Sequence, residues 1–207
     1  MIKIFLLILA PMFLVVMLLT ETSGANSESK IQNIFTSNLD NDEISNSYDD
    51  IINQTFKDVA KIDPNDKQMI LIFGANLDPY SNMLKKDIAN SKDLQEKLKN
   101  IFSSYYFNSY ENLRHKQFHE GDFVDVDTKT IIDIYGIKAT PTLIFTDKVG
   151  KAIIIVPGYM PTKQFLTTMD FMLKKKWKNK NRKNGEVYQA LKEFYIDNGI
   201  EIRQKDR

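Results

Sequence analysis

Hydrophobic positions occur in blocks with two different spacings, and these blocks predict strands interleaved with helices. The continuous apolar run from Gln68 to Phe73 is flanked by turn residues, which is typical of a central strand covered on both faces. The other predicted strands are 105–107, 142–146 and 152–156, and the predicted helices are 48–61, 78–88, 93–102, 128–135, 162–177 and 186–197. This order predicts an α/β fold in which a central mixed sheet is sandwiched by helices.

The N-terminal region carries a targeting pattern. A basic residue precedes the apolar run Ile4–Leu19 and small polar residues follow it, as in a secretory signal that could be cleaved after Gly24 or Ala25. The run is slightly short for a spanning helix of about 20 residues, but a retained anchor stays open. We therefore expect residues 1–25 to be a signal peptide or membrane anchor and the rest to lie in the periplasm or cell envelope. Residues 26–47 are polar and predict a flexible spacer.

The amino-acid composition excludes several classes of function. The chain has no cysteine, which excludes disulfides, thiolate nucleophiles, iron–sulfur clusters, cysteine-ligated zinc and a lipoprotein anchor. Only oxygen and imidazole ligands remain for a metal, and there are two histidines. The 28 basic and 27 acidic residues nearly balance, which argues against a dedicated nucleic-acid-binding protein.

Three landmarks resemble the thioredoxin superfamily. The first is the strand Met69–Phe73 followed by the helix start Asp78–Ser81 (Asp-Pro-Tyr-Ser). The second is Tyr135–Phe145 (Tyr-Gly-Ile-Lys-Ala-Thr-Pro-Thr-Leu-Ile-Phe), which is similar to the family's stretch around its cis-proline, and the third is Gly158 before the last helix of the domain. The resemblance covers roughly residues 48–177 and implies a thioredoxin-like fold. The exported thioredoxins linked to sulfur oxidation are the members that it resembles best.

Active members of that superfamily carry a Cys-x-x-Cys pair at the start of the helix after the central strand. The matching positions here are Asp78 and Ser81, with Pro79 and Tyr80 between them. An oxygen atom cannot form a mixed disulfide, so the resemblance implies no thiol–disulfide exchange and no redox cofactor. Many thioredoxins also bury an acid six positions before the motif, where this chain has Ile72. We expect a protein without catalytic residues at this site.

We call Asp78–Ser81 the degenerate motif, because it lacks both cysteines, and this motif could still bind a ligand or partner. Asp78 either only caps the helix or also contacts a ligand with a carboxylate held at a helix N-terminus. The resemblance implies a cis bond between Thr140 and Pro141, in a loop whose backbone binds substrate peptides in relatives; here the loop either keeps that role or only shapes the chain. We expect the face formed by Asp78–Ser81 and Thr140–Pro141 to bind an exported protein or peptide as a scaffold or chaperone-like factor.

A competing hypothesis places an enzyme in the polar stretch 108–127. His115 and His119 are four residues apart, so on a helix both imidazoles would share one face, and Glu120 or Asp122 could complete a metal site for metal-assisted or redox chemistry. The alternative is two solvated histidines in a polar insertion. The residues around them resemble a loop as much as a helix.

The C-terminal part, residues 178–207, continues a basic run and adds a helix. Seven of the ten residues from Lys174 to Lys183 are basic, and Trp177 lies among them. This run is either a solvated helix end or a contact for an anionic membrane surface or acidic partner, and we expect no nucleic-acid binding. The helix at 186–197 either packs on its own domain or docks into a partner.

Overall fold

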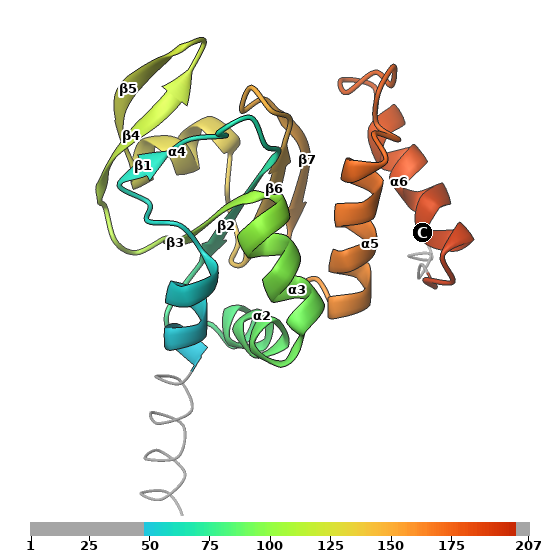
Figure 1. Ribbon diagram of the computed structural model, residues 1–207, viewed down its shortest axis with the longest axis horizontal. Helices are drawn as coiled ribbons and strands as arrows, with labels where there is room; N and C mark the ends of the chain where they lie inside the picture. The colour runs from blue at the N-terminus through green and yellow to red at the C-terminus, as the bar shows by residue number, and fades with distance from the viewer. Residues whose placement is uncertain (1–47, 202–207) are drawn as a thin grey trace, which may run out of the picture. The chain divides into compact units, whose positions relative to one another are not determined.

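The structure is a computed structural model that describes residues 48–201 (Figure 1). The predicted signal or anchor at 1–25 and the spacer at 26–47 lie outside the described residues. Within residues 48–201, no helix combines the length and the apolar character that crossing a membrane would require.

The centre of the fold is a four-stranded mixed sheet with the order β3-β2-β6-β7. Strand β2 pairs in parallel with β3 and antiparallel with β6, and β7 pairs antiparallel with β6. Every residue of β2 is buried, because both faces of this apolar strand are covered. The strands are β2 (Met69–Gly74), β3 (Ser103–Asn108), β6 (Thr142–Thr146) and β7 (Ala152–Pro157).

Helices cover both faces of this sheet, as the sequence predicts. On one face, Ile70 and Ile72 of β2 pack with side chains from α2, α3, α5 and α6. On the other face, Leu71 and Phe73 pack with Ile131 of α4 and with Ile62 of a short strand. The helices are α2 (Pro79–Asn90), α3 (Lys92–Glu96), which continues into a π-helical turn (Lys97–Ile101), α4 (Thr128–Tyr135), α5 (Thr162–Leu173) and α6 (Glu186–Asp197).

The polar stretch at 108–127 contains regular structure that the sequence analysis missed. Its strands β4 (Arg114–His119) and β5 (Asp122–Asp127) form an antiparallel hairpin. Glu120 and Gly121 make the turn, both with positive φ, and two-residue turns of that kind suit a tight hairpin. Strand β1 (Lys61–Ile62) adds in parallel to β4, so a second, three-stranded sheet forms.

Two helices are shorter than predicted. The helix predicted at 48–61 ends at residue 55, because the chain beyond it pairs with the sheets: the Lys57 N–H donates to the Ser104 carbonyl over 2.9 Å. Helix α5 ends at Leu173 instead of residue 177. Lys175 there adopts a left-handed conformation that stops the helix, and its N–H donates to the Met172 carbonyl.

Helix α6 packs on its own domain. Its residues Val187, Leu191 and Tyr195 are buried in the same core as α5. From the same helix, the Tyr188 hydroxyl accepts from the Ile155 N–H (3.1 Å) and lies 3.2 Å from the Ile155 carbonyl. The Tyr188 hydroxyl therefore covers backbone groups on the outer edge of β7, and no other strand among residues 48–201 pairs with that edge. The apolar face of the helix is thus occupied within the chain.

Candidate functional site

The degenerate motif lies at the start of α2, after the loop that follows the central strand β2. Strand β2 ends at Gly74, and Asp78 is the N-cap of α2, with Pro79 in the first helical position. The Asp78 carboxylate accepts from the N–H groups of Tyr80 (3.4 Å) and Ser81 (3.0 Å). Aspartate and proline suit these two positions because the cap satisfies free N–H groups and proline has none to leave unpaired.

A hydrogen bond joins Asp78 and Ser81, the first and last residues of the motif. The Ser81 hydroxyl donates to Asp78 Oδ2 over 2.6 Å and accepts from the Ala75 N–H over 3.1 Å. Ser81 is fully buried, so a substrate cannot reach its oxygen in this conformation. The arrangement is that of a closed cap and not of an activated nucleophile.

Asp78 also contacts the proline loop. Desolvation pushes the pKa of Asp78 up, but hydrogen bonds from the Ser81 side chain and N–H and from the Tyr80 N–H, together with the nearby Thr140 side chain, lower the pKa below its usual value. Asp78 is therefore a carboxylate at neutral pH. The contact with Thr140 places the degenerate motif beside Thr140–Pro141, although about 60 residues separate them in the chain.

The proline loop has a defined backbone pattern. The Thr140–Pro141 peptide bond is cis, and the Pro141 carbonyl accepts from the Gly158 N–H over 2.7 Å. The neighbouring Ala139 carbonyl accepts from the Thr142 hydroxyl over 2.7 Å. Within residues 48–201, neither the N–H nor the carbonyl of Thr140 makes a backbone hydrogen bond. Thr140 therefore presents an unpaired stretch of backbone next to Asp78.

Three exposed apolar side chains surround the N-terminus of α2: Leu77 is 94% exposed, Tyr80 58% and Met83 45%. We call them the apolar rim. Leu77 has a φ of 66°, a left-handed conformation that a leucine rarely adopts. The sequence analysis included Tyr80 in the expected binding face but missed Leu77 and Met83, because hydrophobic residues are normally placed in the core until a structure shows otherwise.

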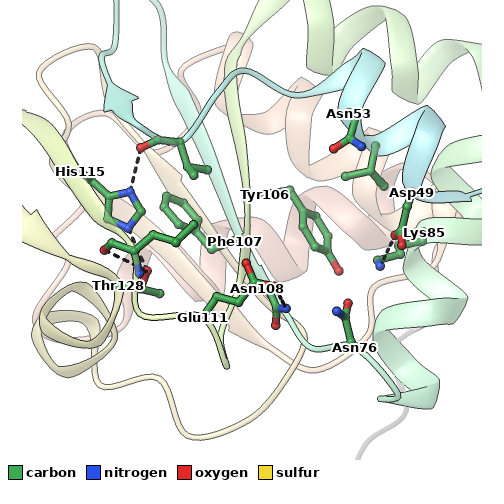
Figure 2. A pocket seen from close by; sticks show the side chains of 13 residues that line it. Asp49, Asn53, Asn76, Lys85, Tyr106, Phe107, Asn108, Glu111, His115 and Thr128 are labelled. Atoms are coloured by element: carbon green, nitrogen blue, oxygen red, sulfur yellow. Dashed lines mark hydrogen bonds and ion pairs between the residues drawn. The ribbon is translucent and has the colours of Figure 1, made fainter. Parts of the chain in front are cut away.

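A polar cleft of about 270 Å³ lies beside the motif, between β3 and the helix at 48–55 (Figure 2). Tyr106 of β3 points into it, with Asn76 of the motif loop close by. The Tyr106 ring fills the space above Gly74, where an added Cβ would lie 1.9 Å from the phenol oxygen. Position 74 therefore requires glycine for packing.

One buried ion pair lies in this cleft. Lys85 of α2 is only 4% exposed and forms an ion pair with Asp49 over 2.5 Å. Burial, together with the negative charges of Asp49 and Asp78, raises the pKa of Tyr106 well above its usual value, so the phenol stays protonated. Its oxygen is buried without a hydrogen-bond partner in the described part of the chain.

The two histidines do not come together. His115 lies in β4 with its ring buried, 2.8 Å from both the Val59 carbonyl and the Thr128 hydroxyl (Figure 2). His119 lies four residues along the same strand, about 13 Å away at the rise of an extended chain. The helical spacing that would have aligned the two imidazoles is absent, and the interpretation of His115 as solvated is wrong. Among residues 48–201, no group of three potential ligands could hold a metal ion.

The basic run from Lys174 to Lys183 follows α5 as a series of turns. The Trp177 indole N–H donates to the Met172 carbonyl over 3.2 Å, and the Arg182 guanidinium lies 5.5 Å from the Trp177 ring centre. Arg182 also pairs with Asp147 at the end of β6. Trp177 is therefore tied to α5, and Arg182 is tied to the end of β6.

Comparison with known proteins identifies the family. Residues 55–173, more than half of the chain, match the thioredoxin-like domain family. The chain belongs to this family. A solved structure described as a thioredoxin-fold protein from Helicobacter pylori is 32% identical, with a TM-score of 0.67 over 72% of this chain and 94% of that one. A thioredoxin-like protein from Clostridium perfringens is 18% identical, with a TM-score of 0.33 over 56% and 82% of the two chains. No curated protein matches.

Family membership bears on the chemistry open to this protein. The protein is a member of the thioredoxin-like domain family, and its sequence contains no cysteine. That combination is compatible with redox inactivity.

Proposed function

We propose that this protein is an exported, redox-inactive member of the thioredoxin-like domain family that binds an extended protein or peptide segment. The binding face consists of Asp78–Ser81, Thr140–Pro141 and the apolar rim. The observation that carries the proposal is the unpaired Thr140 backbone, which lies beside a fixed carboxylate and exposed apolar side chains. Export rests on the N-terminal targeting pattern.

Backbone pairing would supply the affinity. An extended segment that runs past Thr140 would exchange N–H and carbonyl hydrogen bonds with it, as peptides do when they add to a sheet edge. Such bonds are largely independent of the peptide's side chains. The Asp78 carboxylate lies near Thr140, so a segment bound at this loop would pass close to a negative charge.

The apolar rim would supply selectivity. The left-handed conformation of Leu77 costs roughly 1–2 kcal/mol for a residue with a Cβ. Its side chain is 94% exposed and gains almost nothing from the core of the domain. An apolar side chain held out in this way is typical of a protein contact surface. We therefore expect the bound segment to carry apolar side chains that pack on Leu77 and Tyr80.

The test is to select, from a random display library, peptides that bind the full-length protein. The binding site of a selected peptide is then mapped from the changes in the protein's amide NMR chemical shifts. We expect changes at Thr140, Tyr80 and Leu77, and weaker binding by roughly tenfold for Leu77→Ser, which removes an anchor side chain. Val149→Ser is the matched control, because Val149 is an exposed aliphatic residue at the other end of the sheet. A selected peptide whose shifts map elsewhere, or no selection of any peptide, would contradict the proposal.

A further inference from the structure

A second surface lies at the opposite end of the central sheet from Asp78. Strands β2 and β3 begin there and β6 ends there, so the full length of β2 separates it from the motif. It contains a groove of about 460 Å³, which we call the basic groove. Its lining residues are Asp66, Lys67, Gln68, Ile101, Asp147, Lys148, Val149, Leu173, Lys175, Trp177 and Lys178.

The basic groove gathers apolar side chains that face solvent. Val149 at the tip of the β6–β7 turn is 67% exposed, Ile101 is 44% exposed and Leu173 at the end of α5 is 38% exposed. These three come from different elements, yet they line one groove together with Trp177. Such a gathering of exposed apolar groups is typical of an interaction surface rather than of ordinary surface.

Positive charge surrounds these apolar groups. Lys175 and Lys178 are exposed, and no acidic side chain of residues 48–201 pairs with either of them. The two acidic residues of the groove are already matched, because Asp147 pairs with Arg182 and Asp66 pairs with Lys148. The groove therefore offers unmatched cations around an apolar centre.

We propose that the basic groove docks the protein on an anionic membrane surface. Aliphatic tips such as Val149 would enter the interface between headgroups and acyl chains, while the lysines meet the lipid phosphates. An acidic protein would match the same charge, and the polyglutamate measurement below distinguishes it from a membrane. Because the groove and the motif lie at opposite ends of the sheet, a docked molecule keeps its Asp78 face open.

The chain contains one tryptophan, and it lines the groove, so its fluorescence reports on this surface alone. The full chain is mixed with vesicles of phosphatidylcholine, or of equal parts phosphatidylcholine and phosphatidylglycerol, each containing brominated phosphatidylcholine as a quencher. This readout ignores insertion of the N-terminal apolar run, which has no tryptophan. We expect quenching of Trp177 only with phosphatidylglycerol present, and loss of that quenching at high salt.

Charge-reversal variants localise the effect. The pair Lys175→Glu and Lys178→Glu should need roughly 30-fold more anionic lipid for the same quenching, because two surface cations at about 1 kcal/mol each are lost. The control pair Lys86→Glu and Lys92→Glu changes the net charge equally at exposed lysines outside the groove, and it should behave like the native chain. Val149→Ser, which keeps the charge, should reduce the depth of quenching.

Three outcomes would overturn the inference. Quenching that is equal in vesicles without phosphatidylglycerol would remove the role of charge. An equal loss in both lysine pairs would show that net charge alone acts. A change in Trp177 emission with polyglutamate but not with anionic vesicles would show that the groove takes an acidic protein instead.

Discussion

At the scale of single residues, two neighbouring tyrosines of β3 show how surroundings decide a role that sequence cannot assign. Tyr105 points to one face, where its hydroxyl donates to the Asp63 carbonyl (3.0 Å) and accepts from the Asp63 N–H (2.9 Å). Tyr106 points to the other face, where its hydroxyl is buried without a partner among the described residues. The two residues are indistinguishable in the sequence pattern, because each is simply an aromatic residue in a strand.

This difference predicts unequal effects of removing the two hydroxyls. Tyr105→Phe leaves both backbone groups of Asp63 unpaired and should lower the free energy of unfolding by about 1–3 kcal/mol. Tyr106→Phe removes a buried oxygen that bonds to nothing, so the free energy of unfolding should stay within about 1 kcal/mol of native or rise. Urea unfolding of both variants measures the contrast. Equal losses would mean that the Tyr106 hydroxyl has a partner in solution.

Asp78 gives a prediction on pH. Its pKa is lowered in the folded state, so the unfolded chain binds the proton more tightly and the carboxylate stabilises the fold above its usual pKa. Asp78→Ala should cost about 1 kcal/mol of unfolding free energy at neutral pH through loss of the helix cap. The difference between the native chain and this variant should shrink as the pH falls through the lowered pKa of Asp78. Urea titrations across acid pH measure it, and a difference that grows toward acid would refute the assignment.

At the scale of elements, the β4–β5 hairpin replaces what the sequence presents as a polar insertion. The hairpin packs at its inner end, because His115 is buried against Phe107 with ring centres 5.4 Å apart. Its outer end at His119 is exposed. One hairpin thus contains a structural histidine and a surface histidine, and the distance between them rules out their joint use.

Alanine substitutions of the two histidines should therefore differ. His115→Ala removes the partners of the Val59 carbonyl and the Thr128 hydroxyl and leaves a cavity beside Phe107, so unfolding free energy should fall by about 2–3 kcal/mol. His119→Ala should change it by less than about 0.5 kcal/mol. Guanidinium unfolding distinguishes the two. Comparable losses would place His119 in a contact that this structure does not contain.

At the scale of the whole molecule, the thioredoxin-like framework is intact around a motif that lacks sulfur. The position of Asp78 at the N-terminus of α2, beside the Thr140–Pro141 loop, keeps the electrostatic setting that stabilises a thiolate in this family. The native chain should accordingly show no reduction of insulin disulfides above a control without protein.

Restoring both sulfurs tests whether the framework still supports the chemistry. The variant with Asp78→Cys and Ser81→Cys should form a disulfide and reduce insulin in the presence of dithiothreitol faster than the reductant alone. The single variant Asp78→Cys is the control, because it has no second thiol to resolve a mixed disulfide. Activity in the native chain would instead show that this protein exchanges electrons by some route other than thiols.

Much of the fold was predictable, and the reason lies in local patterns. The apolar run of β2, the helix start at Asp78 and the helix at 128–135 agree with the structure, because strand periodicity and helix caps depend only on neighbouring residues. The hairpin at 114–127 was missed, because short strands in a polar stretch carry little hydrophobic pattern. The turn residues Glu120 and Gly121 were the one local signal of it.

The sequence by itself determined that the protein is an α/β chain of the thioredoxin-like kind and that no thiol can act in it, because element order and the absence of an atom are both properties of the chain. The resemblance already placed Asp78 beside Thr140, and only the tertiary structure decided that His115 meets Val59 and that Val149 and Trp177 share one groove. Those contacts join segments far apart in the chain, so they follow from strand register and packing, which local spacing does not encode.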